Sequence, residues 1–515
     1  MRRRLVPLAP LLLVLLAPTL GLAAPSSGGP QQETTDASTE TDVPGEQVAE
    51  TEHTIELDGE TVPYRATAAN MILEDEDGEP IGSLYYTAYT RTDVDDPSTR
   101  PVSFIYNGGP GSASMWLHMG AFGPRRIVVN DSGATPPAPY ELVDNAGSLI
   151  DVTDMVFIDP VGTGFSRPVG EGEGSDFWGI DEDAASLTEF IYQYVTRNGR
   201  WNSPKFLMGE SYGTTRSAVL VNRLQRRAGM DFNGVVLISA VLDFETLLFA
   251  EGHDISYVVY LPTYAATAAY HGMIPAPDDL ETFLDEVREF ALGDYHQALA
   301  QGARLPADTR QSIIERLAAY TGLSEDYIDR ADLRVDASHF RAELQRTEGR
   351  STARLDSRYE GFLTDLLNET AEYDPQSTAI SGAYVAAINQ YLRDVLGYES
   401  EHRYVGGGGV RDWNWSRAGS RGWAGATNVA PDLVEAMIRN PHLKVQFENG
   451  YYDLATPFFA VEYTDWHMGL PAELRDNLRH RYYEAGHMMY VVEEELLALK
   501  ANVADFIEWA TSGAE

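Results

Sequence analysis

Short apolar runs, each ending in a turn that contains glycine, proline or a small residue, constrain the fold of this 515-residue chain most strongly. Longer segments with helical spacing, such as 181–196 and 214–227, lie between these runs. Strand, turn, helix and strand in this order predict an α/β fold with a mostly parallel sheet flanked by helices. The expected buried strands are 102–106, 155–159, 205–208, 235–239, 444–448 and 480–484.

Residues 246–404 have a different pattern. Apolar side chains there recur at the i, i+3, i+4 and i+7 spacing of amphipathic helices, once over 280–290 and again over 313–320. We therefore expect a mainly helical cap insertion, with residues 53–245 and 405–515 forming one domain around it.

The N-terminal residues are separable from the expected domain. Three arginines, an apolar run over residues 5–22 and small residues near Ala23 are typical of a secretory signal peptide, here 1–23. The alternative is a membrane anchor, which three prolines and a length of about 18 residues disfavour. Residues 24–52 lack aromatic side chains and read as an acidic disordered linker. We expect an exported protein, periplasmic or extracellular, with no stable membrane span after signal removal.

Charge and cysteine content exclude some partners. The formal net charge is −40, so nucleic acid and anionic membrane surfaces would be repelled. A surface this acidic also suits high salt, which is a hypothesis only. The chain has no cysteine, so an exported form carries no disulfide, which favours a bacterial or archaeal envelope. The sequence leaves the oligomeric state open.

The stretch F-L-M-G-E-S-Y-G-T-T, residues 206–215, places a G-x-S-x-G pentapeptide between a strand and a helix. This pattern is the nucleophile elbow of the α/β-hydrolase fold, in which a tight turn lifts the serine hydroxyl clear of the sheet. Ser211 is then the candidate nucleophile. The alternative is a plain turn in which the serine caps the helix.

A serine nucleophile needs a histidine base and a carboxylate that orients it. In the elbow fold these residues follow the serine in the order Asp or Glu, then His, each after a later strand. Asp453 follows the strand 444–448, and His487 follows the last strand and a glycine. We predict a catalytic triad of Ser211, Asp453 and His487.

Attack by serine produces an oxyanion, which backbone amides must stabilise. One amide belongs to Tyr212, the residue after the nucleophile, and the other to an earlier strand-end loop. The loop N-G-G-P-G, residues 107–111, fits because Gly108 and Gly109 lack side chains that would keep a ligand from the backbone.

Together these motifs resemble the serine carboxypeptidase family, relatives of carboxypeptidase Y and wheat serine carboxypeptidase, in a bacterial-type member. The resemblance covers about residues 65–510 and implies release of C-terminal amino acids from peptides. It implies Gly109 and Tyr212 as the oxyanion hole, with Asn107, Gly108 and Glu210 holding the substrate carboxylate. No metal or cofactor is implied. The matching motifs are N-G-G-P-G-S-A-S, F-I-D-P-V-G-T-G-F-S, G-E-S-Y-G, G-Y-Y-D and A-G-H-M.

The residues expected to bind the substrate's terminal carboxylate, Asn107, Gly108 and Glu210, are here called the carboxylate grip. This site departs from the family pattern at one position. A carboxyl group binds a carboxylate only when one of the two is protonated, so Glu210 needs a raised pKa. The family pattern has a second glutamate where this chain has Ala121, and His118 is a possible replacement on spacing. We therefore expect recognition of the terminal carboxylate to be weaker or less acid-dependent.

The sequence leaves other functions open. Another serine hydrolase of the same fold, such as an aminopeptidase, esterase or acyltransferase, would use the same triad. A non-catalytic binding protein that keeps the fold is a further alternative. The aromatic stretch D-W-N-W-S, residues 412–416, is interpreted as packing, with an acyl-pocket lining as the alternative.

Overall fold

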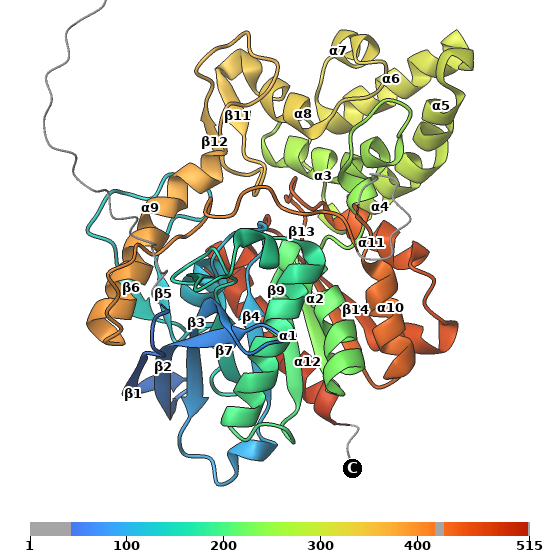
Figure 1. Cartoon of the computed structure of the whole chain (residues 1–515). Coiled ribbons are helices and arrows are strands. Elements are labelled where there is room, and N and C mark those ends of the chain that lie inside the picture. Colours follow the sequence, from blue (N-terminus) through green and yellow to red (C-terminus); the bar gives the residue numbers. More distant parts are fainter. Residues whose placement is uncertain (1–42, 418–426, 513–515) are drawn as a thin grey trace, which may run out of the picture. The chain divides into compact units, whose positions relative to one another are not determined.

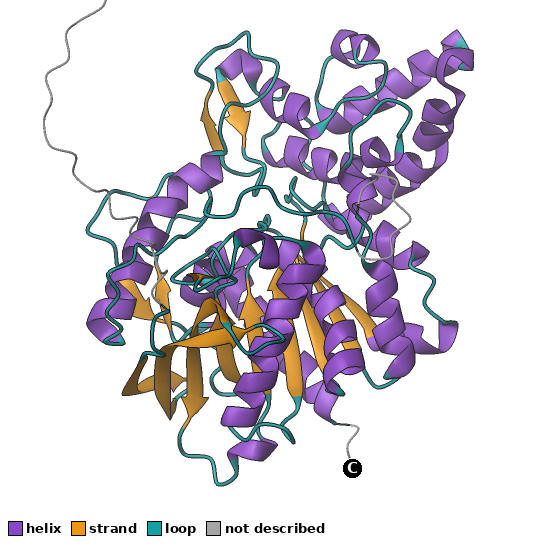
Figure 2. Cartoon of the chain, viewed as in Figure 1, coloured by secondary structure: helices purple, strands orange, loops and turns teal. Residues whose placement is uncertain are grey.

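The expected strands lie next to one another in one sheet and run from its middle to one edge. The computed structural model describes residues 43–417 and 427–512, and in these residues the main sheet has ten strands (Figures 1 and 2). Nine lie in the order β1 (Val48–Leu57), β2 (Glu60–Glu74), β3 (Pro80–Arg91), β7 (Asp154–Ile158), β4 (Val102–Tyr106), β9 (Lys205–Glu210), β10 (Gly234–Ile238), β13 (Lys444–Gly450) and β14 (Leu478–Tyr483), and β8 (Arg167–Pro168) pairs with β3.

The six strands from β7 to β14 are parallel, and β1, β2 and β3 are antiparallel to their neighbours. All six expected strands are confirmed within two residues at either end. Because carboxyl ends of neighbouring parallel strands meet at one edge of a sheet, the loops after β4, β9, β10, β13 and β14 lie together there.

Helices bury both faces of the parallel strands. Along β9, Phe206 and Met208 belong to one hydrophobic core and Leu207 to the other, as the twofold alternation of a strand requires. Two buried faces explain why these strands read as continuous apolar runs. One face is covered by α1 (Ile180–Arg197), α2 (Tyr212–Arg223) and α10 (Ala430–Arg439), and the other by α12 (Glu493–Thr511).

The segment between β10 and β13 is mainly helical, as expected. It also contains a small hairpin of β11 (Arg350–Thr352) and β12 (Glu360–Phe362). Besides α10, its helices are α3 (Ile255–Tyr270), α4 (Leu280–Phe290), α5 (His296–Gln301), α6 (Ala307–Thr321), α7 (Glu325–Arg330), α8 (Ala337–Glu343) and α9 (Pro375–Gln390). Two further elements outside it are the hairpin of β5 (Arg125–Ile127) and β6 (Leu142–Asp144) and the helix α11 (Phe458–His467).

This insertion shares hydrophobic cores with the sheet. Tyr384 and Tyr391, at and just after α9, pack in the same core as α12. Conversely, Tyr452 and Phe458, which flank Asp453, pack with α3 and its neighbours. The described residues from 43 onward belong to one compact unit. The domain boundaries at 246 and 404 stay a prediction.

The expected linker 24–52 is wrong at its C-terminal end, because β1 begins at Val48 and pairs with β2. Glu46 also bonds to Arg197 at 2.8 Å, and the Gln47 N–H donates to the Asn70 side chain at 2.6 Å. β1 is an edge strand in which polar residues alternate, so its apolar content is low. Composition alone therefore does not distinguish it from a linker. The expected signal peptide 1–23 lies outside the described residues. No helix within the described ranges is long and apolar enough to cross a membrane.

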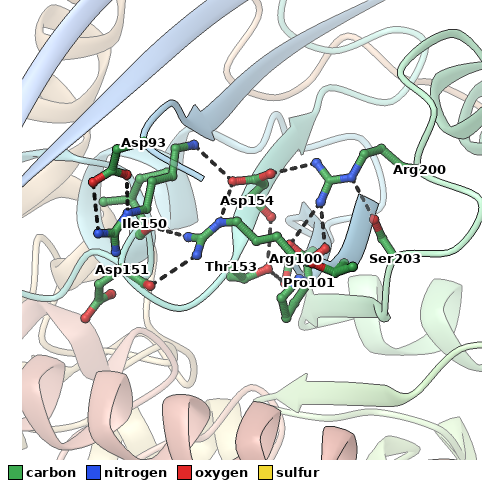
Figure 3. A network of polar contacts seen from close by, with 12 residues as sticks. Asp93, Arg100, Pro101, Ile150, Asp151, Thr153, Asp154, Arg200 and Ser203 are labelled. Carbon is green, nitrogen blue, oxygen red and sulfur yellow. Dashed lines mark hydrogen bonds and ion pairs between the residues drawn. The ribbon is translucent and has the colours of Figure 1, made fainter. Parts of the chain in front are cut away.

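A buried ion network joins the starts of β4, β7 and β9 (Figure 3). Asp154, whose side chain is 1% exposed, accepts from Arg100 at 2.8 Å and from Arg200 at 2.6 Å. Arg200 also donates to the Ser203 hydroxyl at 2.7 Å. Both oxygens of Asp154 are thus paired, and the network fixes the sheet at the edge opposite the loops that follow the strands.

Candidate active site

Ser211 occupies the sharp turn between β9 and α2. Its φ is 60° and its ψ −129°, a conformation rarely adopted by a residue with a side chain. The turn is held because the Ser211 N–H donates to the Ile238 carbonyl at 3.0 Å and the Thr214 N–H donates to the Ser211 carbonyl at 2.8 Å. Ser211 thus has the backbone of a nucleophile elbow and is not a simple helix cap.

Asp453 and His487 are brought together by the loops after β13 and β14. The Nδ1 of His487 lies 2.7 Å from Oδ2 of Asp453, and the two residues are 4% and 0% exposed. Asp453 also accepts from the N–H groups of Ala455 and Thr456 at 2.7 and 3.0 Å. Although burial disfavours the charged imidazolium, the Asp453 carboxylate raises the pKa of His487 above its ordinary value.

Two residues that the sequence analysis missed tie the three loops together. The Ser239 hydroxyl, at the end of β10, donates to the His487 carbonyl at 2.8 Å. The Thr456 hydroxyl lies 2.7 Å from Oδ2 of Asp453 and 3.0 Å from the Ser239 carbonyl. A serine directly after a strand and a threonine three residues after an aspartate were the available signals, but both are common in ordinary turns.

The loop 107–111 lies directly against the elbow. A Cβ at Gly108 would stand 2.4 Å from the Tyr212 nitrogen and 2.6 Å from the Glu210 carbonyl, so no side chain fits. Gly109 has a φ of 107°, which favours glycine. The absence of side chains therefore lets the loop pack against the elbow. This is a second role, besides the access for a ligand that the sequence suggested.

Glu210 and Asn107 meet beside the elbow. The Asn107 amide donates to Oε1 of Glu210 at 2.8 Å, and its oxygen accepts from the Leu117 N–H at 3.0 Å. The Tyr490 hydroxyl donates to Oε2 of Glu210 at 2.6 Å. Burial raises the pKa of Glu210 to about 7, which neighbouring His487 and these two donors partly oppose.

His118 does not take the place suggested for it. Its Nε2 lies 2.6 Å from the Tyr89 hydroxyl, and its ring stacks on Phe157 at 4.5 Å between centroids. Burial lowers the pKa of His118 to about 3, so this imidazole stays neutral. The side chain beside Glu210 is Tyr490, which follows His487 by three residues. The expectation failed because spacing along a helix does not reveal which face meets Glu210.

Arg216 is a buried residue that contacts the loop 107–111. Its guanidinium is 1% exposed, pairs with Asp183 at 2.7 Å and donates to the Asn107 carbonyl at 2.7 Å. It also lies about 5 Å from the ring centres of Tyr106 and Tyr212. One buried cation thereby connects the loop 107–111 with the helix that follows the nucleophile.

The aromatic stretch 412–416 contacts the elbow. Trp413 packs edge-on against Tyr212 with 5.1 Å between ring centroids, and Trp415 packs against Phe244 at the same separation. These rings support the turn that carries Ser211.

This chain is similar to known proteins in its family pattern, its sequence and its fold. A family model described as serine carboxypeptidase matches residues 75–484. A 126-residue segment is 33% identical to pheromone-processing carboxypeptidase KEX1 of Saccharomyces cerevisiae, covering 24% of this chain and 16% of that protein. A 176-residue segment is 26% identical to serine carboxypeptidase-like 45 of Arabidopsis thaliana, covering 32% of this chain and 34% of that protein. The matched segments thus span about a sixth and a third of these curated relatives.

Among solved structures, the prohormone-processing carboxypeptidase KEX1(delta)p of Saccharomyces cerevisiae matches with a TM-score of 0.51. The match covers 86% of this chain and 91% of that one at 16% sequence identity, and at this identity it bears on the fold alone. With the strand order described above, it confirms the α/β-hydrolase fold expected from the elbow.

Proposed function

Because the chain belongs to the serine carboxypeptidase family, we propose that it is a serine carboxypeptidase that releases C-terminal amino acids from peptides. The observation that carries the proposal is the buried Asp453–His487 pair at the same sheet edge as the strained elbow of Ser211. Nucleophile, base and orienting carboxylate follow in the chain order that this fold requires.

In the proposed reaction, Ser211 Oγ attacks the carbonyl of the last peptide bond while His487 accepts its proton. Asp453 holds the Nδ1 side of the imidazole and stabilises the imidazolium that forms. His487 then protonates the departing amine, which leaves an acyl-enzyme on Ser211. Water, activated by the same histidine, hydrolyses this ester and restores the serine.

The amides of Gly109 and Tyr212 are the proposed donors to the oxyanion. The contact of Gly108 with the Tyr212 nitrogen supports this assignment because it brings the loop and the elbow together. Each such donor is worth about 2.7–4 kcal/mol of transition-state stabilisation.

Asn107, Gly108 and Glu210 are proposed to hold the carboxylate of the residue being removed. With a pKa of about 7, Glu210 stays protonated up to near neutral pH and can share a proton with that carboxylate. The Tyr490 hydroxyl bonds to Glu210, whereas Ala121 has no polar side chain that could do so. A single carboxyl group would then perform this task, which fits weaker or less acid-dependent recognition.

The decisive experiment uses peptides with blocked N-termini and varied C-termini. Mass spectrometry should show stepwise loss from the C-terminus, and a serine-directed phosphonylating reagent should abolish it. Ser211→Ala should lower kcat by about 10⁴–10⁶-fold, with Ser512→Ala, an exposed serine at the end of α12, as a matched control. An aminopeptidase would leave blocked peptides intact, an acyltransferase would favour an alcohol acceptor over water, and a binding protein would be unaffected by Ser211→Ala.

Export to the periplasm or the extracellular space is proposed from residues 1–23, and the lack of cysteine keeps a bacterial or archaeal envelope as the proposed setting. Expression in a bacterial host, followed by N-terminal sequencing of the exported protein, tests the proposed export. A mature N-terminus near Ala24 would support export. Retention of the intact chain inside the cell would contradict it.

A further inference from the structure

The loop of the hairpin β11–β12, residues 353–359, touches the backbone on both sides of the Asp453–His487 pair. We call this loop the strap. The His487 N–H donates to the Leu355 carbonyl at 2.6 Å. The Leu454 N–H, directly after Asp453, donates to the Arg354 carbonyl at 3.0 Å. The insertion thus supplies acceptors to both loops that carry the pair.

Asp356 adds a charged contact on the histidine side. Its Oδ2 accepts from the Gly486 N–H at 3.1 Å, and Gly486 directly precedes His487. The side chain of Asp356 is 0% exposed and pairs with Arg358, which is 8% exposed, at 2.5 Å. A buried carboxylate held by a bidentate guanidinium has a fixed orientation, so its contact with Gly486 is fixed as well.

Gly486 is packed tightly against the strap. A Cβ at Gly486 would lie 2.4 Å from the Cβ of Asp356 and 2.5 Å from its Cα. The separation between the strap and the histidine loop therefore leaves no room for any other residue at this position. This close contact is a physical reason for the glycine before His487.

The other side of the strap is anchored to the insertion. The Ser357 hydroxyl lies 2.6 Å from the Thr267 hydroxyl on α3, and the Ser357 carbonyl lies 2.7 Å from Nε2 of His271. The Ser357 N–H donates to the Tyr452 carbonyl at 2.9 Å. The strap therefore connects α3 with the residues around Asp453 and His487.

We propose that Asp356 is a positioning residue, which through Gly486 sets the place of the His487 imidazole relative to Asp453 and Ser211. The expected effect on rate rests on the proposed function. The expected effect on the Asp453–His487 hydrogen bond does not depend on it. A displacement of about 1 Å in a reacting group can cost about 10²-fold in rate.

The primary test is Asp356→Asn in the full chain. An amide has one acceptor oxygen instead of two, so in either orientation its NH2 group faces N–H donors, either those of Gly486 and Arg358 or those of Arg358 alone. The substitution also removes the negative charge that pairs with Arg358. We expect kcat on N-blocked peptides to fall by about 10–10²-fold, with KM within about twofold because the carboxylate grip is untouched. The far-downfield proton resonance of His487 Nδ1–H in the hydrogen bond to Asp453 should shift or broaden.

Glu360→Gln is the matched control, since Glu360 lies on the same hairpin and pairs with Arg350 at 3.2 Å away from the triad loops. It should leave kcat and the resonance unchanged. If Asp356→Asn does not fold, Arg358→Lys serves instead, because lysine keeps the charge but loses the bidentate contact. It should give a smaller loss of kcat and the same direction of change in the resonance.

Unchanged kcat and an unchanged resonance in a folded Asp356→Asn protein would overturn the proposal, as would equal effects in Glu360→Gln. The resonance does not depend on turnover, so it tests the strap even if the chain releases no C-terminal residue. Failure of the proposed function would instead appear as inactivity of the unaltered protein and no effect of Ser211→Ala.

Discussion

Glu210 is the residue through which pH acts most directly on the proposed substrate site. It is 4% exposed, and burial raises its pKa to about 7 from its ordinary value of 4.5. Below that pH the side chain is protonated and can bind a carboxylate. Above it, the ionised side chain would repel the terminal carboxylate of a peptide. The two partners of Glu210, Asn107 and Tyr490, both favour the ionised form.

The titration of Glu210 should appear in how the reaction rate depends on pH. For peptides with a free C-terminus, kcat/KM should fall as pH rises through about 7 and continue to fall about tenfold per unit. Peptides with an amidated C-terminus lack the repelled charge and should not show this fall. Rate profiles measured on matched free and amidated peptides check the prediction. Identical alkaline limbs for the two substrates would contradict it.

Tyr490→Phe removes a donor that favours the ionised form of Glu210, so the pKa of Glu210 should rise further. A hydrogen bond to a charged group is worth about 1.5–3 kcal/mol and one pKa unit corresponds to about 1.4 kcal/mol, so the alkaline limb should move up by about one to two units. The same rate profiles measure this. Tyr391→Phe is the control, since Tyr391 bonds to Tyr89 in the same core, and it should leave the limb in place.

At the scale of elements, the strands are fixed at both ends by polar groups. At the carboxyl edge, Ser239 and Thr456 join the loops after β10, β13 and β14. At the other edge, Asp154 joins the starts of β4, β7 and β9 through Arg100 and Arg200 (Figure 3). Between these edges β4, β7, β9 and β10 are largely apolar on both faces, so the polar contacts at their ends help to set how the strands are aligned.

Asp154→Ala should lower the free energy of unfolding by about 3–5 kcal/mol, because two largely buried guanidinium groups lose their partner. Denaturant unfolding measures the change. Asp144→Ala removes an exposed ion pair with Arg125, whose side chains are 60% and 36% exposed, and should cost less than about 1 kcal/mol. Equal losses in the two variants would show that burial of the Asp154 network contributes nothing.

At the scale of the whole molecule, charge is the dominant property. The formal net charge of −40 comes from 78 acidic and 38 basic residues. Many of the arginines pair with carboxylates, as in the pair of Arg310 with Asp329 at 2.9 Å. The remaining acidic groups repel one another, which opposes the folded state.

Sodium chloride should therefore raise the unfolding temperature by several degrees between low salt and about 1 M, where the screening length falls to about 3 Å. Calorimetry over a salt series checks this. The effect should shrink toward pH 5, where carboxylates begin to protonate. An unfolding temperature that does not depend on salt at neutral pH would argue against the high-salt hypothesis.

The sequence alone determined the parallel sheet, the elbow and the order of Ser211, Asp453 and His487. Buried strands need continuous apolar runs, and the elbow needs glycines at fixed offsets, so both features leave local patterns. The edge strand β1 left no such pattern. Only the tertiary structure decided that Tyr490 pairs with Glu210, that His118 packs on Phe157, and that Asp356 supports Gly486. Asp356 and Gly486 lie 130 residues apart in the chain, and packing between distant segments leaves no local pattern to read.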